Sequence, residues 1–123
     1  MQNTDDQHPL DLSYLIGMVG HNPGFIIEIF DTFIEHTPIY LDEMDEALAL
    51  QNWEGVSNCA HKLKPTFSYI GRDDVTKLVT DIEMKARNHV VDQIPEDIAR
   101  LKVIIQHIYI QLDLAKKDIQ FTS

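Results

Sequence analysis

The chain has 123 residues, of which 44% are hydrophobic. This is enough for the core of one domain and too little for two independent ones. Acidic residues outnumber basic ones by 20 to 10, so the positive surface of a nucleic-acid-binding protein is missing. The single cysteine, Cys59, cannot form an internal disulfide, which excludes a disulfide scaffold and fits a reducing compartment.

The charge is unevenly distributed along the chain. Residues 1–50 contain ten Asp and Glu and no Lys or Arg, whereas residues 51–123 contain ten of each sign. The start of the chain has neither the basic nor the apolar region of a signal peptide, and no apolar run reaches the roughly 18 residues that span a bilayer. We therefore expect a cytoplasmic protein that binds neither membrane nor nucleic acid.

The first three predicted elements are helices. A short helix from Asp11 to about Val19 has apolar residues at helical spacing and can end at Gly20. A long helix then begins after Asn22 and Pro23, because an N-cap followed by proline is a typical helix start. Pro38 lies inside this helix and is expected to kink it. A third helix begins at Asn52, and its apolar stripe ends at Ile70, before Gly71.

Two further helices complete the chain. The fourth starts at Asp73 or Asp74 and ends near Asn88, with Val75, Leu78, Val79 and Ile82 as its buried stripe. The last starts around Pro95, and Lys116 and Lys117 are placed to complement its C-terminal dipole. We predict an all-α antiparallel four-helix bundle with a short N-terminal capping helix. The bundle is expected over residues 11–118, between tails at 1–10 and 119–123.

His61 differs from the other five histidines in its helical position. His8, His21, His36, His89 and His107 fall in predicted tails, loops, the expected kink or the edge of an apolar stripe. His61 lies about 160° around its helix from Leu63, which marks the core stripe. It must therefore face solvent or a partner. Its helical neighbours are mostly compact, namely Ser57, Asn58, Pro65 and, a turn further, Ser68, so a partner surface could approach the ring.

The stretch from Ala60 to Lys64, followed by Gly71 and by Ile82-Glu83, resembles the signature of histidine-containing phosphotransfer (HPt) domains. The resemblance covers about residues 10 to 115. It implies that His61 accepts a phosphoryl group in a multistep two-component phosphorelay. It also implies that Lys64 helps to hold the phosphoryl group, and Lys62 is a second candidate for this role. A neutral imidazole is a competent nucleophile near pH 7, and a nearby cation offsets charge on the transferred group.

The remaining machinery is expected on the partner. The chain has no glycine-rich phosphate loop or nucleotide motif, so we expect a phosphohistidine carrier without autonomous kinase activity and without a cofactor of its own. The resemblance implies a receiver domain of a response regulator or hybrid kinase, which brings the aspartate and Mg²⁺. Ser57, Asn58, Pro65 and Ser68 are the predicted docking residues. We expect a monomer, either free-standing or as one domain of a hybrid kinase.

Pro65 departs from the family pattern, which usually has glycine four residues after the histidine. Proline within a helix removes a hydrogen bond to the carbonyl of His61 and costs about 3 kcal/mol in an ordinary interior, so we expect a bend there.

Two other functions compete with the relay. A metal-binding bundle needs Glu-x-x-His pairs, which this sequence lacks. A non-catalytic module of the same shape would bind a kinase or receiver without taking phosphate.

Overall fold

The computed structural model describes the backbone of residues 10–20 and 22–122, and side chains within these ranges up to residue 119. The described residues form five helices and no strand: α1 (Ser13–Val19), α2 (Pro23–Ala49), α3 (Trp53–Tyr69), α4 (Asp73–Arg87) and α5 (Ile94–Thr122). The predicted all-helical class is confirmed. None of these helices has both the length and the apolar character needed to cross a membrane.

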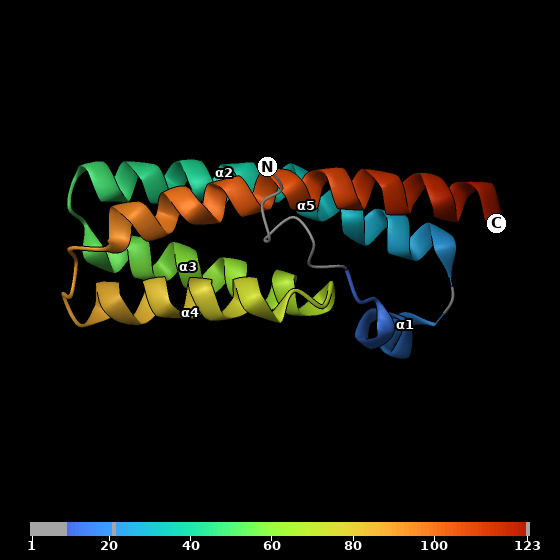
Figure 1. The fold of residues 1–123 in the computed structure, drawn as a ribbon, viewed down its shortest axis with the longest axis horizontal. Coiled ribbons are helices and arrows are strands. Elements are labelled where there is room, and N and C mark those ends of the chain that lie inside the picture. Colours follow the sequence, from blue (N-terminus) through green and yellow to red (C-terminus); the bar gives the residue numbers. More distant parts are fainter. Residues whose placement is uncertain (1–9, 21, 123) are drawn as a thin grey trace, which may run out of the picture.

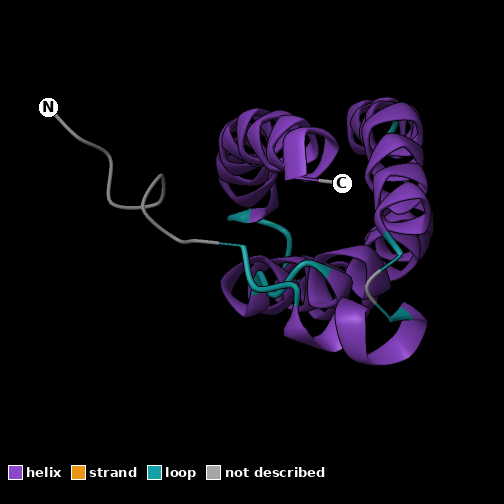
Figure 2. Cartoon of the chain, turned by 90° about the vertical axis from the view of Figure 1, so that its right-hand side faces the viewer, coloured by secondary structure: helices purple, strands orange, loops and turns teal. Residues whose placement is uncertain are grey.

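The four long helices run side by side and reverse direction at each connection, while α1 lies near the end where α3 turns into α4 (Figure 1). Seen along the long axis, the helices are grouped around a common centre (Figure 2). Every helix contributes to one core because each has an apolar stripe. The buried side chains include Leu15, Phe30, Phe33, Met44, Leu63, Phe67, Val79, Ile82, Leu101, Ile105 and Ile108.

Local sequence explains the helix starts that were predicted from caps. The side chain of Asn22 accepts a hydrogen bond from the N–H of Phe25 at 3.0 Å, and that of Asn52 accepts one from Gly55 at 3.1 Å. Both bonds satisfy amide groups that lack a partner inside the helix. α2 and α3 therefore begin at the predicted positions, and each continues through its internal proline, Pro38 or Pro65.

Gly71 joins α3 to α4 and allows the segment just before α1 to pack against this turn. Its φ is +75°, a region that favours glycine. A Cβ at this position would also overlap Asp11, whose N–H donates to the carbonyl of Ile70 at 2.9 Å. A side chain at position 71 would therefore displace the segment that leads into α1.

Arg72 fixes the start of α4 to α5. Its side chain is only 1% exposed, but all three guanidinium nitrogens donate hydrogen bonds to polar side chains. Its Nε and one terminal nitrogen donate to the two carboxylate oxygens of Asp74, and the other terminal nitrogen donates to Gln111 at 3.0 Å. A buried guanidinium with satisfied donors fixes the geometry of this corner.

α5 differs from its predicted end. It continues to Thr122, beyond residue 118, where the bundle was expected to stop. Lys116 and Lys117 therefore do not lie in its last turn, and the predicted role at the helix dipole is wrong. Lys116 instead forms a 2.6 Å ion pair with Asp31 of α2, and Lys117 pairs with Asp113 at 3.2 Å.

Candidate functional site

His61 lies on the outer face of α3, as its helical position predicts. Its side chain is 71% exposed. Leu63 and Phe67 on the same helix are buried in the core, because they occupy the opposite side of the 3.6-residue period. The imidazole is therefore open to a reaction partner while its helix is anchored from behind.

Glu83 of α4 orients the imidazole ring. Its carboxylate is only 3% exposed, and its Oε2 lies 3.1 Å from Nδ1 of His61. A carboxylate can only accept hydrogen bonds, so this contact favours the tautomer with the proton on Nδ1. The lone pair then belongs to Nε2, on the other edge of the ring. The pairing leaves an oriented nucleophilic nitrogen on an exposed side chain.

Two cations share the same carboxylate with His61. Lys64 donates from Nζ to Oε1 of Glu83 at 2.6 Å, and Arg87 donates from a terminal nitrogen to Oε2 at 2.9 Å. Burial raises the pKa of Glu83. The hydrogen bond and positive charge of Lys64, joined by the contact with His61, outweigh this effect and hold the pKa below its usual value. Glu83 therefore stays ionised at neutral pH, although it is buried.

Lys62 does not join this group. Its Nζ lies over the ring of Tyr40 on α2, 5.8 Å from the ring centre, a distance typical of a cation–π contact. Lys62 is the residue after His61, so about 100° of helix separates the two side chains. Of the two lysines predicted beside the phosphate, the structure places Lys64 in the His61 network and directs Lys62 toward α2.

The predicted docking residues divide into two groups. Asn58 and Pro65 are exposed and Ser68 is half-buried, so these three remain accessible near His61. Ser57 is only 6% exposed, so it offers little surface to a partner, and its docking role stays a prediction. Ser57 lines a cavity at the edge between α3 and α4, together with Ala86 and Arg87 of α4. Helical position alone did not reveal how closely α4 approaches.

Glu83 and Arg87 are the site residues whose roles sequence reasoning missed. Glu83 was recognised within the family-like pattern, but without a function. A signal was present in the spacing: Val75 and Val79 lie eight and four residues before Glu83, so the glutamate continues the apolar stripe of α4. A charged residue at a core position usually has a partner. Arg87, four residues later, is one such partner.

The other histidines in the described residues contribute nothing to this network. His36 and His89 are exposed and His107 is half-buried, whereas His8 and His21 lie outside the described residues. Within residues 10–20 and 22–119, no three His, Cys, Asp or Glu side chains form a group that could hold a metal ion.

Comparison with solved structures identifies a protein of similar fold. The chain is similar to the crystal structure of histidine-containing phosphotransfer protein B (HptB) from Pseudomonas aeruginosa PAO1, with a TM-score of 0.83. The match covers 91% of this chain and 97% of that protein at 18% sequence identity. At this identity the likeness concerns the fold alone. Comparison with curated proteins gives no match.

The sequence itself shows the family. A family model described as Hpt domain matches residues 28–113, which is most of the chain and contains α3, α4 and the whole His61 network. The chain therefore belongs to the Hpt domain family, the histidine-containing phosphotransfer domains of two-component signalling.

Proposed function

We propose that His61 carries the phosphoryl group in a multistep phosphorelay, accepting it from the aspartate of one receiver domain and passing it to another. The observation that supports this most directly is the exposed imidazole whose Nδ1 meets a buried, ionised glutamate. A carrier needs a nucleophile that a large partner can reach, and it must hold that nucleophile in one orientation.

In the proposed step, Nε2 of His61 attacks the phosphorus of the receiver's aspartyl phosphate in line. An N–P bond forms as the P–O bond to the aspartate breaks, and the aspartate leaves as a carboxylate. The ring becomes more positive during attack, and Glu83 offsets this charge through the Nδ1 proton. Transfer to a second receiver is the reverse reaction with a different carboxylate.

Lys64 is the proposed phosphate-stabilising cation. Its amine is bound to Glu83 beside the ring, and its flexible stem lies one helical turn after His61. We expect the amine to move from Glu83 to the equatorial oxygens as the phosphoryl group arrives. Arg87 then continues to balance Glu83. We expect the receiver to supply Mg²⁺, because Lys64 and Arg87 add positive charge at His61 and do not form a set of oxygen ligands for a metal ion.

We interpret the fold as an antiparallel four-helix bundle of α2 to α5, with α1 capping one end. This arrangement leaves the outer face of α3 uncovered at His61. We expect the domain to act as a monomer, because its own helices already close a core around the buried residues of all five elements. The cytoplasm remains the expected compartment, as argued from the sequence.

Incubation with phosphorylated receiver domains tests the proposal. We expect the wild-type protein to gain an acid-labile, base-stable phosphate and the His61→Gln variant to gain none. His36→Gln is a matched control, because His36 is also an exposed histidine in a helix, and it should be labelled like the wild type.

Binding of a receiver without labelling of the wild type would instead support a non-catalytic module. Labelling of His61→Gln would place the acceptor elsewhere. Both results contradict the proposed role of His61, and circular dichroism of each variant checks that the helices are intact.

A further inference from the structure

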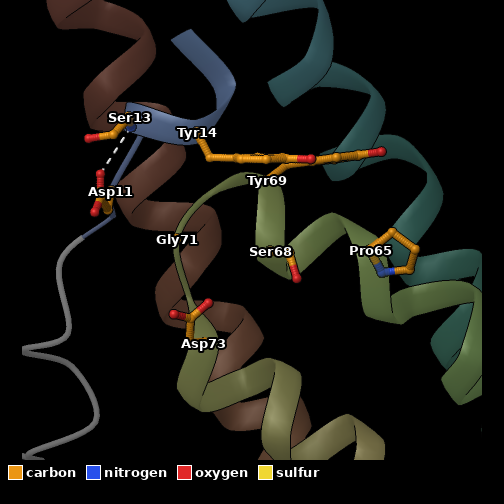
Figure 3. Close-up of a pocket in the computed structure, with 8 residues that line it drawn as sticks. All are labelled: Asp11, Ser13, Tyr14, Pro65, Ser68, Tyr69, Gly71 and Asp73. Atoms are coloured by element: carbon orange, nitrogen blue, oxygen red, sulfur yellow. Dashed lines mark hydrogen bonds between the residues drawn. The ribbon is translucent and has the colours of Figure 1, made fainter. Parts of the chain in front are cut away.

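An open cavity of about 560 Å³ lies beside the His61 face, where α1 meets the turn between α3 and α4 (Figure 3). Pro65 and Ser68 of α3 line it. These residues follow His61 by four and seven positions, so they share its helix face at about 6 and 10 Å along the axis. The cavity is thus a continuation of the surface that presents the imidazole.

Two tyrosines form one wall of the cavity. Tyr14 of α1 and Tyr69 of α3 lie with their rings nearly parallel, at 8° and 6.1 Å between centres, and Figure 3 shows both rings edge-on along one side. Tyr14 is 57% exposed, so much of this aromatic surface is open to solvent. The bond from Asp11 to Ile70 and the close approach at Gly71 fix α1 here, which means that the wall is formed before any partner binds.

Two carboxylates form another part of the lining. Asp11 and Asp73 both line the cavity and are exposed. Hydrogen bonds from Ser13 lower the pKa of Asp11, so it is ionised at neutral pH. No Lys or Arg of the described residues forms an ion pair with either carboxylate, and the nearby Arg72 is turned inward to Asp74 and Gln111. Among the described residues, the cavity therefore carries two carboxylates that have no ion pair with a lysine or arginine.

The surface along α3 thus changes sign. Lys64 and Arg87 supply positive charge at His61, whereas Asp11 and Asp73 supply negative charge at the far end of the helix. A receiver that aligns its acidic active site with His61 must place another part of its surface over the cavity. Charge complementarity favours a basic group at that point.

We propose that this cavity receives an arginine or lysine side chain of the receiver domain, lying on the Tyr14–Tyr69 wall with its charged end at Asp11 and Asp73. The inference rests on the proposed function, because it assumes that a receiver approaches His61. Arginine suits the site better than lysine, since its planar group both stacks on an aromatic ring and binds a carboxylate.

The proposal defines a measurable property of the partner. The basic residue must lie about 10 to 15 Å from the receiver's phosphorylated aspartate, the rise of seven to ten helical residues. Other occupants are disfavoured by charge. A second copy of this chain would bring a net charge of −10, and residues 1–9 contain Asp5 and Asp6 but no Lys or Arg.

Affinity and transfer measurements with the receiver domains of the same organism test this inference. The variant is Asp11→Asn combined with Asp73→Asn, and Asp73→Asn alone avoids any change at the start of α1. The control is Asp42→Asn combined with Glu46→Gln, which removes the same charge from the exposed face of α2. Calorimetry gives the Kd for unphosphorylated receivers, and transfer assays give KM and kcat.

We expect the cavity variant to raise Kd and KM about tenfold for the cognate receiver, as for loss of a charge-assisted contact. The control should change them less than about twofold. kcat, and direct labelling of His61 by phosphoramidate, should be unchanged. Changing the receiver's basic residue to Asp should raise Kd similarly, and Asp73→Arg should restore binding to that receiver.

Several results would overturn the inference. One is an equal Kd for the wild type and the cavity variant. Another is an equal loss of affinity in the cavity and control variants. A third is sedimentation of this protein alone as a dimer that the cavity variant abolishes, which would make a second copy the occupant. Labelling of His61 by the receiver with the same Kd and KM in the wild type and the cavity variant rejects only this inference. Cavity-dependent binding without labelling rejects only the phosphorelay, so the two failures are distinguishable.

Discussion

Two pairs of neighbouring helices are joined by lysine–carboxylate contacts of the same length. Lys64 of α3 meets Glu83 of α4 at 2.6 Å, and Lys116 of α5 meets Asp31 of α2 at 2.6 Å. Their surroundings differ, because Glu83 is 3% exposed and Asp31 is 43% exposed. A buried carboxylate depends on its partners, whereas an exposed one exchanges them for water at little cost.

The difference extends to the number of partners. Glu83 accepts from His61, Lys64 and Arg87, so one buried side chain sets the positions of three outward-facing groups. The α2–α5 contacts join residues in pairs, such as Lys102 with Asp45. Equal distances therefore conceal unequal roles: the α3–α4 contact organises the candidate site, and the α2–α5 contacts add to a surface that the core already holds together.

Removal of Glu83 should have the largest effect. Glu83→Ala leaves a small cavity and takes the shared acceptor from three donors, so we expect a loss of about 1–3 kcal/mol in unfolding free energy. The cost stays within this range because all three donors can still reach water. Urea unfolding followed by circular dichroism measures it.

Asp45→Ala is the matched change between α2 and α5, where we expect less than about 1 kcal/mol. Glu83→Gln keeps the side-chain volume and one acceptor, so it separates packing from charge. Equal losses for Glu83→Ala and Asp45→Ala would remove the distinction between the two contacts.

The candidate site should depend on Lys64 more than on Lys62. Lys64→Ala removes the cation bound beside His61, and we expect transfer from a phosphorylated receiver to slow about tenfold, equivalent to ~1.4 kcal/mol. Lys62→Ala removes an amine that lies over Tyr40, and we expect a change of less than about twofold. Rapid-quench measurement of phosphohistidine compares the two. A larger effect of Lys62 would mean that its side chain turns toward the phosphoryl group during transfer.

The two contacts should affect the pH dependence of stability at opposite ends of the pH range. The folded-state pKa of Glu83 is lowered, so its stabilising effect is present above the unfolded-state pKa and is lost as pH falls through the folded-state value. The folded-state pKa of Lys116 is raised, chiefly by its hydrogen bond to Asp31. The effect of Lys116 is therefore present below its unfolded-state pKa and is lost as pH rises through the folded-state value.

Thermal unfolding of the wild type, Glu83→Gln and Lys116→Met at a series of pH values checks both the acid and the alkaline dependence. Glu83→Gln should reduce the loss of stability between pH 5 and the acid limit, on the order of the usual carboxylate range. Lys116→Met should lower stability at neutral pH, and it should remove the further loss above about pH 10 that comes from deprotonation of Lys116. An acid-range slope that Glu83→Gln leaves unchanged would show that other carboxylates, such as Asp11, dominate it.

The helices were accessible to sequence reasoning because their signals are local. Asn22 and Asn52 cap helices through residues three positions away, and the stripe around Leu63 determines that His61 faces outward. What the sequence did not reveal are contacts between helices. Ser57 is nearly buried beside α4, Lys62 lies over Tyr40 of α2, and Glu83 reaches His61 across 22 residues of sequence. The period of one helix does not specify its rotation or distance relative to the next, so these contacts require the packed structure.

The smallest expected effect concerns the exposed contacts themselves. Lys116→Ala and Lys102→Ala each remove an ion pair between α2 and α5 whose carboxylate is about two-fifths exposed. Each should lower the unfolding free energy by less than about 1 kcal/mol, because water replaces the lost partner and salt already screens the pair. The double variant should show the sum of the two single losses, since these sites are fourteen residues apart on α5 and share no partner. Urea unfolding at low and high salt measures all three variants. A loss above about 2 kcal/mol, or one that persists unchanged at 1 M salt, would show that these surface pairs hold α5 in place as firmly as Glu83 holds His61.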